Sequence, residues 1–264
     1  MKKYAPRSHG ENRMKHEGDT HRARNKYYLR DNFNLEYLLY NRFNWMNKFI
    51  NNDDIGIEVG SGTGISKEYI RCNNYKTTDF AKNDWLDYKM IDALDTNFKN
   101  ESLDFIISSN MIHHVPYPTL FFEEMNRILK PGGKLIIQEI NCSFFMKILL
   151  RMMRHEGFDF TIDVFDKNKI CTDENDLWSA NCAIPNLLFD DINKFKSNFS
   201  YFKVKHTDFS EFIIFINSGG VISKTIYIPL PKFLSIGFRK RFANHLTNFK
   251  FSLHARLSFD CWAC

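Results

Sequence analysis

The chain has 264 residues, 44% of them hydrophobic and 25% charged, which suits a globular protein with one α/β domain and room for an added cap region. No apolar run approaches the roughly 20 residues that span a bilayer, and the polar N-terminus lacks a signal-peptide pattern, so we expect a cytoplasmic protein. Six irregularly spaced cysteines exclude a disulfide-stapled scaffold. Cys261 and Cys264 have redox-motif spacing, but we interpret them as a chance pair.

Residues 1–30 carry the charge surplus, with nine Lys or Arg and three acidic residues against a net charge of +5 for the whole chain. We expect a basic, flexible leader over 1–30 and the main domain over 31–264. Such a leader could meet an anionic substrate, a membrane surface or RNA. The plainer interpretation is a solvated, poorly ordered N-terminus.

The first elements combine a helix with a buried strand and a glycine-rich turn. Residues 34–50 place their apolar side chains on one helical face. The apolar residues of this face are Leu35, Leu38, Leu39, Phe43, Met46, Phe49 and Ile50. Ile55–Val59 then reads as a short buried strand, followed by the turn Gly60–Gly64 and a helix to about Arg71.

Strand and helix patterns alternate from there to residue 140, which indicates a parallel, doubly wound sheet. Strands are predicted at Tyr75–Thr78, Tyr88–Ile91, Leu103–Ser109 and Lys134–Ile140. A helical stripe precedes the last of these, and Pro131-Gly132-Gly133 ends that helix.

The region after residue 140 has weaker patterns. Ser143–Arg154 is predicted as an apolar helix with basic positions, residues 157–200 as irregular, and 201–206 and 251–259 as the sixth and seventh strands. We therefore predict a Rossmann-like α/β fold with a seven-stranded, mostly parallel sheet and flanking helices. Residues 141–200 and 208–246 would form a cap on the substrate side.

The strongest motif is Glu58-Val59-Gly60-Ser61-Gly62-Thr63-Gly64, at the junction of strand and helix. Ligands of open α/β sheets bind at the carboxyl ends of the strands, and glycine lets the backbone approach them closely. The spacing differs from the G-x-G-x-x-G pattern that binds a dinucleotide pyrophosphate. With Glu58 two residues before the first glycine, it suits a ligand that has an ammonium group and no phosphate there.

Carboxylates stand at the ends of the next two strands. Asp79 could accept hydrogen bonds from both hydroxyls of a ribose, and Asp92-Ala93 could meet an adenine amino group. Strand-end aspartates also simply cap turns. Their appearance in order at successive strand ends favours a nucleoside-containing ligand.

With these motifs in place, residues 57–139 resemble the class I S-adenosylmethionine (SAM)-dependent methyltransferases of the small-molecule branch. Further matching stretches are Ser102–Phe105, Asn110–His114 and Ile128–Leu135. The resemblance implies SAM as cofactor, with Glu58 near its methionine amine, Asp79 on its ribose and Phe80 against its adenine. The cofactor-binding residues that it implies are Glu58, Gly60, Ser61, Gly62, Thr63, Asp79, Phe80, Asp92, Ala93, Asn110 and Met111.

Short segments beyond residue 140 are similar to methyltransferases from bacterial surface-polysaccharide clusters. They lie at 155–159, 180–185 and 218–220. We therefore expect O-methylation of a small-molecule acceptor, a sugar, sugar nucleotide or related polar metabolite. C-methylation of a quinone-like or lipid acceptor and SAM binding without catalysis stay open as alternatives.

Other partners have less support in the sequence. Methylation of RNA or protein is supported only by the basic leader, and we expect no nucleic-acid partner. The apolar helices predicted at 143–154 and 233–246 could lie on a membrane surface, although packing against the core is the expected arrangement. The oligomeric state is left open.

Four residues are candidates for the acceptor's proton chemistry, since an alcohol must lose its proton. His113 and His114 follow the fourth strand, where one of them would act as base or position the acceptor, and His155 with Glu156 forms a second pair. Glu139 could orient the acceptor or cap the next helix. We expect no metal, because adjacent histidines on an extended chain point apart.

Overall fold

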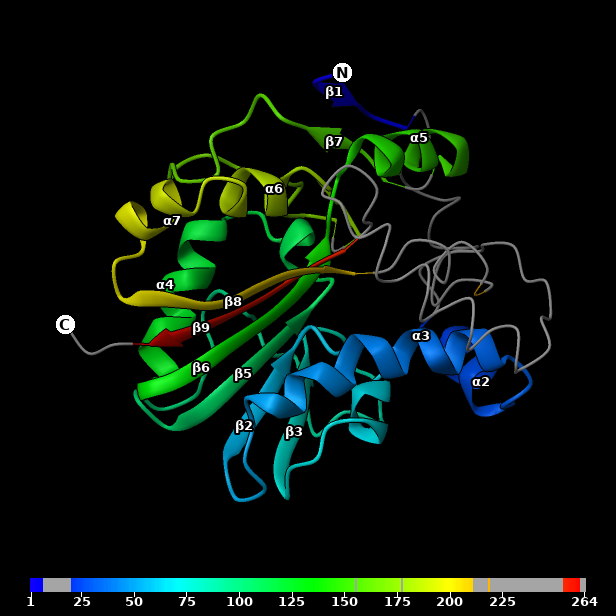
Figure 1. The fold of residues 1–264 in the computed structure, drawn as a ribbon, viewed down its shortest axis with the longest axis vertical. Coiled ribbons are helices and arrows are strands. Elements are labelled where there is room, and N and C mark those ends of the chain that lie inside the picture. The colour runs from blue at the N-terminus through cyan, green and yellow to red at the C-terminus, as the bar shows by residue number, and fades with distance from the viewer. Residues whose placement is uncertain (7–19, 155, 177, 211–217, 219–253, 262–264) are drawn as a thin grey trace.

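The computed structural model describes residues 1–6, 20–154, 156–176, 178–210, 218 and 254–261 (Figure 1). Its main sheet has seven strands in the order β4-β3-β2-β5-β6-β9-β8. The strands are β2 (Ile55–Val59), β3 (Asn74–Asp79), β4 (Tyr88–Lys89), β5 (Leu103–Ser109), β6 (Leu129–Ile140), β8 (Phe202–Ser210) and β9 (His254–Cys261). In the described part of this sheet β9 pairs antiparallel with β6 and with β8, and the other neighbouring strands pair in parallel. The predicted Rossmann-like fold is confirmed.

Strand β5 shows how the sheet builds two cores. Phe105 and Ile107 contribute to the cluster beneath α3 (Phe33–Phe43), whereas Ile106 joins the cluster beneath α4 (Pro118–Ile128). All three side chains are fully buried, as expected for a central parallel strand covered on both faces. Figure 1 shows α3 on one side of the sheet and α4, α6 (Ile184–Phe189) and α7 (Ile192–Asn198) on the other.

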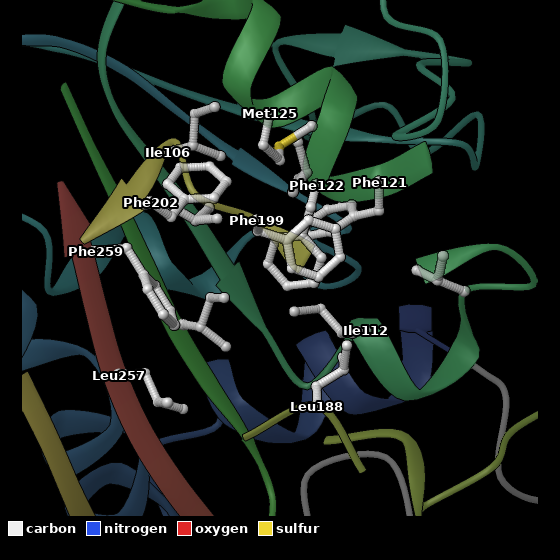
Figure 2. Packing of buried hydrophobic residues seen from close by; sticks show 14 of the residues in the cluster. Ile106, Ile112, Phe121, Phe122, Met125, Leu188, Phe199, Phe202, Leu257 and Phe259 are labelled. Atoms are coloured by element: carbon white, nitrogen blue, oxygen red, sulfur yellow. The ribbon is translucent and has the colours of Figure 1, made fainter. Parts of the chain in front are cut away.

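The core on the α4 side is rich in phenylalanine (Figure 2). The ring centroid of Phe122 lies 4.7 Å from that of Phe199 and 5.2 Å from that of Phe195. Phe195 in turn lies 5.0 Å from Phe259 of β9. Each such pair adds about 0.5–1.5 kcal/mol beyond the burial of its area. The aromatic cluster thereby fixes α7 and β9 against the same face.

Several predicted boundaries were wrong. The helix predicted over 34–50 is α3 followed by a 3-10 turn at Asn44–Lys48, and the helix predicted to reach Arg71 is only a 3-10 turn at Ile65–Glu68. In the second case Gly64 takes a left-handed conformation (φ 64°), which precludes a smooth entry into an α-helix. Strand β4 stops two residues earlier than predicted, and Met90 follows it with a φ of 57°.

Strand β6 begins before the predicted Pro-Gly-Gly stop. Leu129 already pairs with Leu103, and Lys134 pairs with Phe105, so the residues between them form a bulge. Gly132 sits in this bulge with a φ of 80°. The Pro-Gly-Gly stretch therefore interrupts the ladder and does not end the element.

The region predicted as irregular contains regular structure. It holds β7 (Phe158–Asp159), α6 and α7, whose apolar residues join the α4-side core. Before it, α5 (Phe144–Met153) matches the predicted helix, and its N-cap Ser143 accepts a hydrogen bond from Met146 N at 3.2 Å. Short helices were missed because each offers only about two turns of periodicity.

The predicted leader is also partly structured. Lys3–Tyr4 forms β1, which pairs antiparallel with β7, and Thr20–Tyr28 forms α2. Ala23 and Tyr27 of α2 are buried, and the Tyr27 hydroxyl lies 2.8 Å from that of Tyr69. Helix α2 therefore packs against the rest of the protein through buried side chains, which its basic composition did not indicate.

None of the helices in the described part of the chain is long and apolar enough to span a membrane. The helix predicted at 233–246, and most of the cap segment 208–246, lie outside the described residues.

Cys261 is a buried strand residue whose thiol lies 3.1 Å from Asn126 Oδ1, which gives it a packing role.

Candidate functional site

A cavity of about 200 Å³ opens at the carboxyl ends of β2, β5 and β6. It is lined by Leu39, Arg42, Phe43, Glu58, Gly60, Ser61, Gly62, Thr63, Ile65, Ser66, Ser109, Asn110, His113, His114, Ile140, Met146, Leu150, Met153, Glu156 and Trp178. The glycine-rich turn therefore shares one cavity with three of the four predicted catalytic residues, His113, His114 and Glu156. This is the position at which open α/β sheets bind ligands.

The glycine-rich turn requires its glycines. Gly60 and Gly62 have φ values of 68° and 49°, in the left-handed region that side chains disfavour. A Cβ on Gly60 would lie only 2.3 Å from Cγ of Met111. The turn thus presents bare backbone to the cavity, with Met111 packed behind it.

Hydrogen bonds fasten this turn to the end of β3. Ser61 N donates to Thr78 O at 2.9 Å, and Thr78 N donates to Ser61 Oγ at 3.1 Å. Gly62 N donates to Asp79 Oδ2 at 2.7 Å. The neighbouring strand therefore holds the loop in its left-handed conformation.

Glu58 is a buried carboxyl group in the cavity wall, with 2% of its surface exposed. Its Oε2 accepts hydrogen bonds from Ser66 Oγ at 2.5 Å and Tyr75 OH at 3.2 Å. Burial raises the pKa of Glu58 to about 7, against the lowering effect of these hydroxyl donors. A cation in the cavity would favour the ionised form, so this carboxyl suits an ammonium group.

The predicted strand-end carboxylates Asp79 and Asp92 are not among the residues that line this cavity. Asp79 also accepts Ala81 N at 2.8 Å through Oδ1, and its backbone oxygen accepts Ile91 N at 3.0 Å. Asp92 Oδ1 accepts Leu94 N at 2.8 Å. A carboxylate has about four acceptor positions, so Asp79 keeps capacity for ribose hydroxyls. The predicted contacts of Asp79, Asp92 and their neighbours Phe80 and Ala93 with a nucleoside stay predictions.

Helix α2 and Trp85 cover the outer side of the turn. Trp85 Nε1 donates to Gly62 O at 3.0 Å, and Arg24 Nη1 donates to Thr63 O at 2.7 Å. The guanidinium of Arg24 also lies over the Trp85 ring, 5.1 Å from its centroid. The residue pattern alone did not indicate this cover, because the contacts join residues 23 to 61 positions apart.

Glu139, at the end of β6, organises the opposite side of the cavity. It is fully buried and accepts hydrogen bonds from Met111 N (2.6 Å) and Ile112 N (2.5 Å), while His113 Nδ1 lies 2.7 Å from its Oε2. Burial alone would raise the pKa of Glu139, but His113 and the backbone donors outweigh it and the net shift is downward. Glu139 therefore stays ionised and fixes a proton on His113 Nδ1.

The side chains of His113 and His114 lie close together, whereas the sequence-based prediction placed them on an extended chain, pointing apart. Residues Ile112–His114 form a 3-10 turn, and the two imidazole centroids are 4.2 Å apart. Glu156 faces both rings: its Oε2 lies 3.8 Å from His113 Nε2, and its Oε1 lies 3.9 Å from His114 Nε2. Burial and the neighbouring His113 lower the pKa of His114 to about 4, so this ring is neutral at pH 7. His155 lies outside the described residues.

Among the lining residues that sequence reasoning did not single out, Arg42 and Trp178 carry groups that can bind a ligand. Arg42 is 7% exposed and lines the cavity from α3. Its position four residues after Leu38 puts a charge on the otherwise apolar helical face, a signal that could have marked it. Trp178 comes from a segment without periodicity, and only the folded chain brings it to the cavity.

Comparisons with known proteins agree with this geometry. Residues 57–137 match a family described as "Methyltransferase domain". Phosphoethanolamine N-methyltransferase 2 of Caenorhabditis elegans is 36% identical over 85 residues, which cover 32% of this chain and 19% of that enzyme. The chain thus matches about a fifth of that enzyme's length.

Among solved structures, a SAM-dependent methyltransferase from Archaeoglobus fulgidus superimposes with a TM-score of 0.51 at 13% identity. The match covers 85% of this chain and 93% of that one. At this identity the likeness shows the fold. Together with the matched family, it extends the common architecture from residues 57–137 to most of the chain.

Proposed function

We propose that this chain, which carries a SAM-dependent methyltransferase domain, methylates a hydroxyl group of a small polar acceptor. The acceptor class we favour is a sugar or sugar nucleotide used in glycan biosynthesis in the cytoplasm. The observation that supports this best is that the glycine-rich turn and His113, whose Nδ1 lies 2.7 Å from Glu139 Oε2, line one cavity. The turn serves the cofactor, and the pair serves the acceptor.

The residues around the turn fit SAM. Glu58 offers a buried carboxylate for the ammonium group, Gly60–Thr63 offers open backbone, and Arg42 offers a cation for the carboxylate of the methionine portion. When bound, SAM supplies a methyl group on a positively charged sulfur, so the methyl is already activated. The main task of the protein is then to align the acceptor oxygen within about 3–3.5 Å of it.

The acceptor's proton is the remaining chemical problem. Since Glu139 holds the Nδ1 proton of His113, the lone pair of this imidazole lies on Nε2, on the side of Glu156. The acceptor oxygen would form its bond to the methyl carbon as the bond from that carbon to the sulfur of SAM breaks, and the proton of the hydroxyl would pass to His113 Nε2. The carboxylate of Glu139 stabilises the imidazolium that results.

The walls beyond the histidines suit a sugar-like molecule. Trp178 offers a flat ring against which the C–H face of a sugar can pack, and Glu156 offers a hydrogen-bond acceptor for its hydroxyls. Met146, Leu150 and Met153 supply apolar surface beside them. A small polar acceptor with an apolar ring face matches this mixture.

The test begins with calorimetric titration of purified protein with SAM and with its demethylated product, alongside Asp79→Ala and Glu58→Gln. We expect micromolar binding that both substitutions weaken. Transfer of labelled methyl from SAM is then measured on sugar nucleotides, free sugars, amino alcohols, quinones and RNA. Product on a sugar hydroxyl supports the proposal.

Other results have definite meanings. Product only on a quinone or lipid favours C-methylation, and SAM binding without product on any acceptor favours a non-catalytic SAM-binding protein. If the folded protein binds neither SAM nor its product, the proposal fails.

A further inference from the structure

Three side chains at the acceptor end of the cavity have the separations of metal ligands. One ligand atom each from His113, His114 and Glu156 lies within 4.8 Å of the other two. A tetrahedral ion with bonds of about 2.0–2.2 Å holds its ligand atoms about 3.3–3.6 Å apart. The two carboxylate oxygens of Glu156 lie 3.8 Å from His113 Nε2 and 3.9 Å from His114 Nε2, a few tenths of an ångström beyond this separation. Small side-chain rotations would bring all three atoms to one ion.

The surroundings orient both imidazoles for this purpose. His113 Nδ1 lies 2.7 Å from Glu139 Oε2, and His114 Nδ1 lies 3.0 Å from the backbone oxygen of Ser179. In metal sites a ligating histidine commonly donates its other ring N–H to a carboxylate or a backbone carbonyl. Here each ring has such a partner on Nδ1, and each turns Nε2 toward Glu156.

The ligand types indicate the class of ion. Two imidazoles with one carboxylate suit Zn²⁺ and neighbouring divalent transition metals, whereas Mg²⁺ and Ca²⁺ prefer oxygen ligands. Three protein ligands leave a further coordination position for water or substrate. Since His113, His114 and Glu156 all line the cavity, that position faces the cavity.

We propose that His113, His114 and Glu156 bind a divalent transition-metal ion such as Zn²⁺ at the acceptor end of the cavity. Metal binding itself does not depend on the function proposed above. The ion's role rests on that function: it coordinates the acceptor hydroxyl, lowers the pKa of that hydroxyl, and the proton is released to water. In the loaded protein the ion replaces His113 as the group that activates the acceptor.

The experiment uses full-length protein stripped with a chelator and titrated with Zn²⁺ or Co²⁺. Metal content is measured by mass spectrometry, and the Co²⁺ absorption spectrum reports the ligand geometry. The variants are Glu156→Gln, which keeps the side-chain shape, and His114→Asn, which keeps a donor near Ser179 O. His206→Asn is the matched control, because His206 packs on Trp45 and Phe49 away from the cavity. Melting temperature and SAM binding confirm that each variant is folded.

We expect one ion per wild-type chain and per His206→Asn chain. Each ligand variant should bind more weakly by at least the roughly 10–100-fold that loss of an outer-shell partner costs in metal sites. The proposal is overturned if the wild-type protein binds no stoichiometric ion. It is also overturned if Glu156→Gln and His114→Asn bind the ion as tightly as the wild type does. A sulfur-to-cobalt charge-transfer band that persists in both variants overturns it too, because it places the ion on cysteines.

Methyl-transfer assays separate this inference from the proposed function. Full transfer activity in metal-free protein overturns the role of the ion in the reaction, while the proposed function stands. A bound ion together with SAM binding, but no transfer to any acceptor, supports the metal site and contradicts the proposed function.

Discussion

The two sides of the cavity are held together by different means. The glycine-rich turn is one short run of chain whose shape depends on main-chain hydrogen bonds to β3 and on positive φ angles. The opposite side is assembled from His113 and His114, Glu139, Glu156 and the segment around Ser179, joined by ionisable side chains. We therefore expect the first side to be most sensitive to changes in its backbone and the second to changes in its side chains.

The largest effect is expected on the acceptor side. His113→Asn keeps an amide donor near Glu139 but removes Nε2, so we expect kcat for methyl transfer to fall about 10²–10⁴-fold. SAM affinity should change by less than about threefold, since the turn is untouched. Single-turnover kinetics and calorimetry measure the two quantities. An equal loss of SAM affinity would show that the two sides do not act separately.

The next effect tests the backbone of the turn. Gly60→Ala places a Cβ 2.3 Å from Met111 Cγ at a φ of 68°, so we expect the free energy of unfolding to fall by about 2–4 kcal/mol, with a loss of SAM binding. The control is Gly132→Ala, which has a φ of 80° but no atom within 4 Å of the added Cβ. It should cost only about 1–2 kcal/mol and leave SAM binding intact. Urea denaturation compares them, and equal losses would refute the steric argument.

Titration of Glu58 gives a smaller, pH-dependent effect. Its pKa of about 7 in the folded protein lies above the ordinary value of 4.5, so its contribution to stability falls as the pH rises from about 4.5 through 7. Binding of an ammonium ligand favours the carboxylate, so SAM affinity should rise about tenfold between pH 6 and pH 8. Tyr75 stays neutral, because burial holds its pKa well above the ordinary value, and Asp79 is the neighbouring charge that adds to the upward shift of Glu58.

The control for this pH profile is Glu58→Gln, which can still accept from Ser66 and Tyr75. Titration of the ligand's own amine affects both proteins equally, so the difference between their profiles reports Glu58. A profile in the variant as steep as in the wild type would assign the pH dependence to another group.

The smallest effect concerns the cover over the turn. Arg24→Gln removes a charged donor to Thr63 O and the contact with Trp85, which should weaken SAM binding by about 0.5–1.5 kcal/mol. Arg22→Gln, an exposed position on the same helix, is the matched control and should leave SAM affinity unchanged. Calorimetry compares the two, and equal weakening would attribute the effect to net charge.

The same contrast explains what could be predicted from the sequence. The turn was predictable because glycines at 60, 62 and 64 and the buried strand before them are local features, and Ile55–Val59 has the predicted bounds. The sheet followed from alternating patterns. Glu58 was also recognised, but its partners Ser66 and Tyr75 depend on how the short 3-10 turn and β3 meet.

The acceptor side was predictable only as a set of candidates. The sequence predicted His113, His114 and Glu156 as candidates but not their arrangement. That arrangement depends on a 3-10 turn at Ile112–His114. The N–H group of Ile112 donates to Glu139, which lies 27 residues later in the chain. Three residues carry too little periodicity to reveal such a turn. The turn brings together the side chains of His113 and His114, which an extended strand would have separated.

The N-terminal part of the chain contacts both sides of the cavity region at once. Strand β1 pairs with β7, which follows Glu156 closely, and α2 hydrogen-bonds to the glycine-rich turn. A two-residue ladder is too short to persist alone, but a tether raises the effective concentration of each contact at its site. The two contacts thus act as a bivalent interaction. Loss of the contact between α2 and the turn would therefore also lower the fraction of molecules in which β1 is paired with β7.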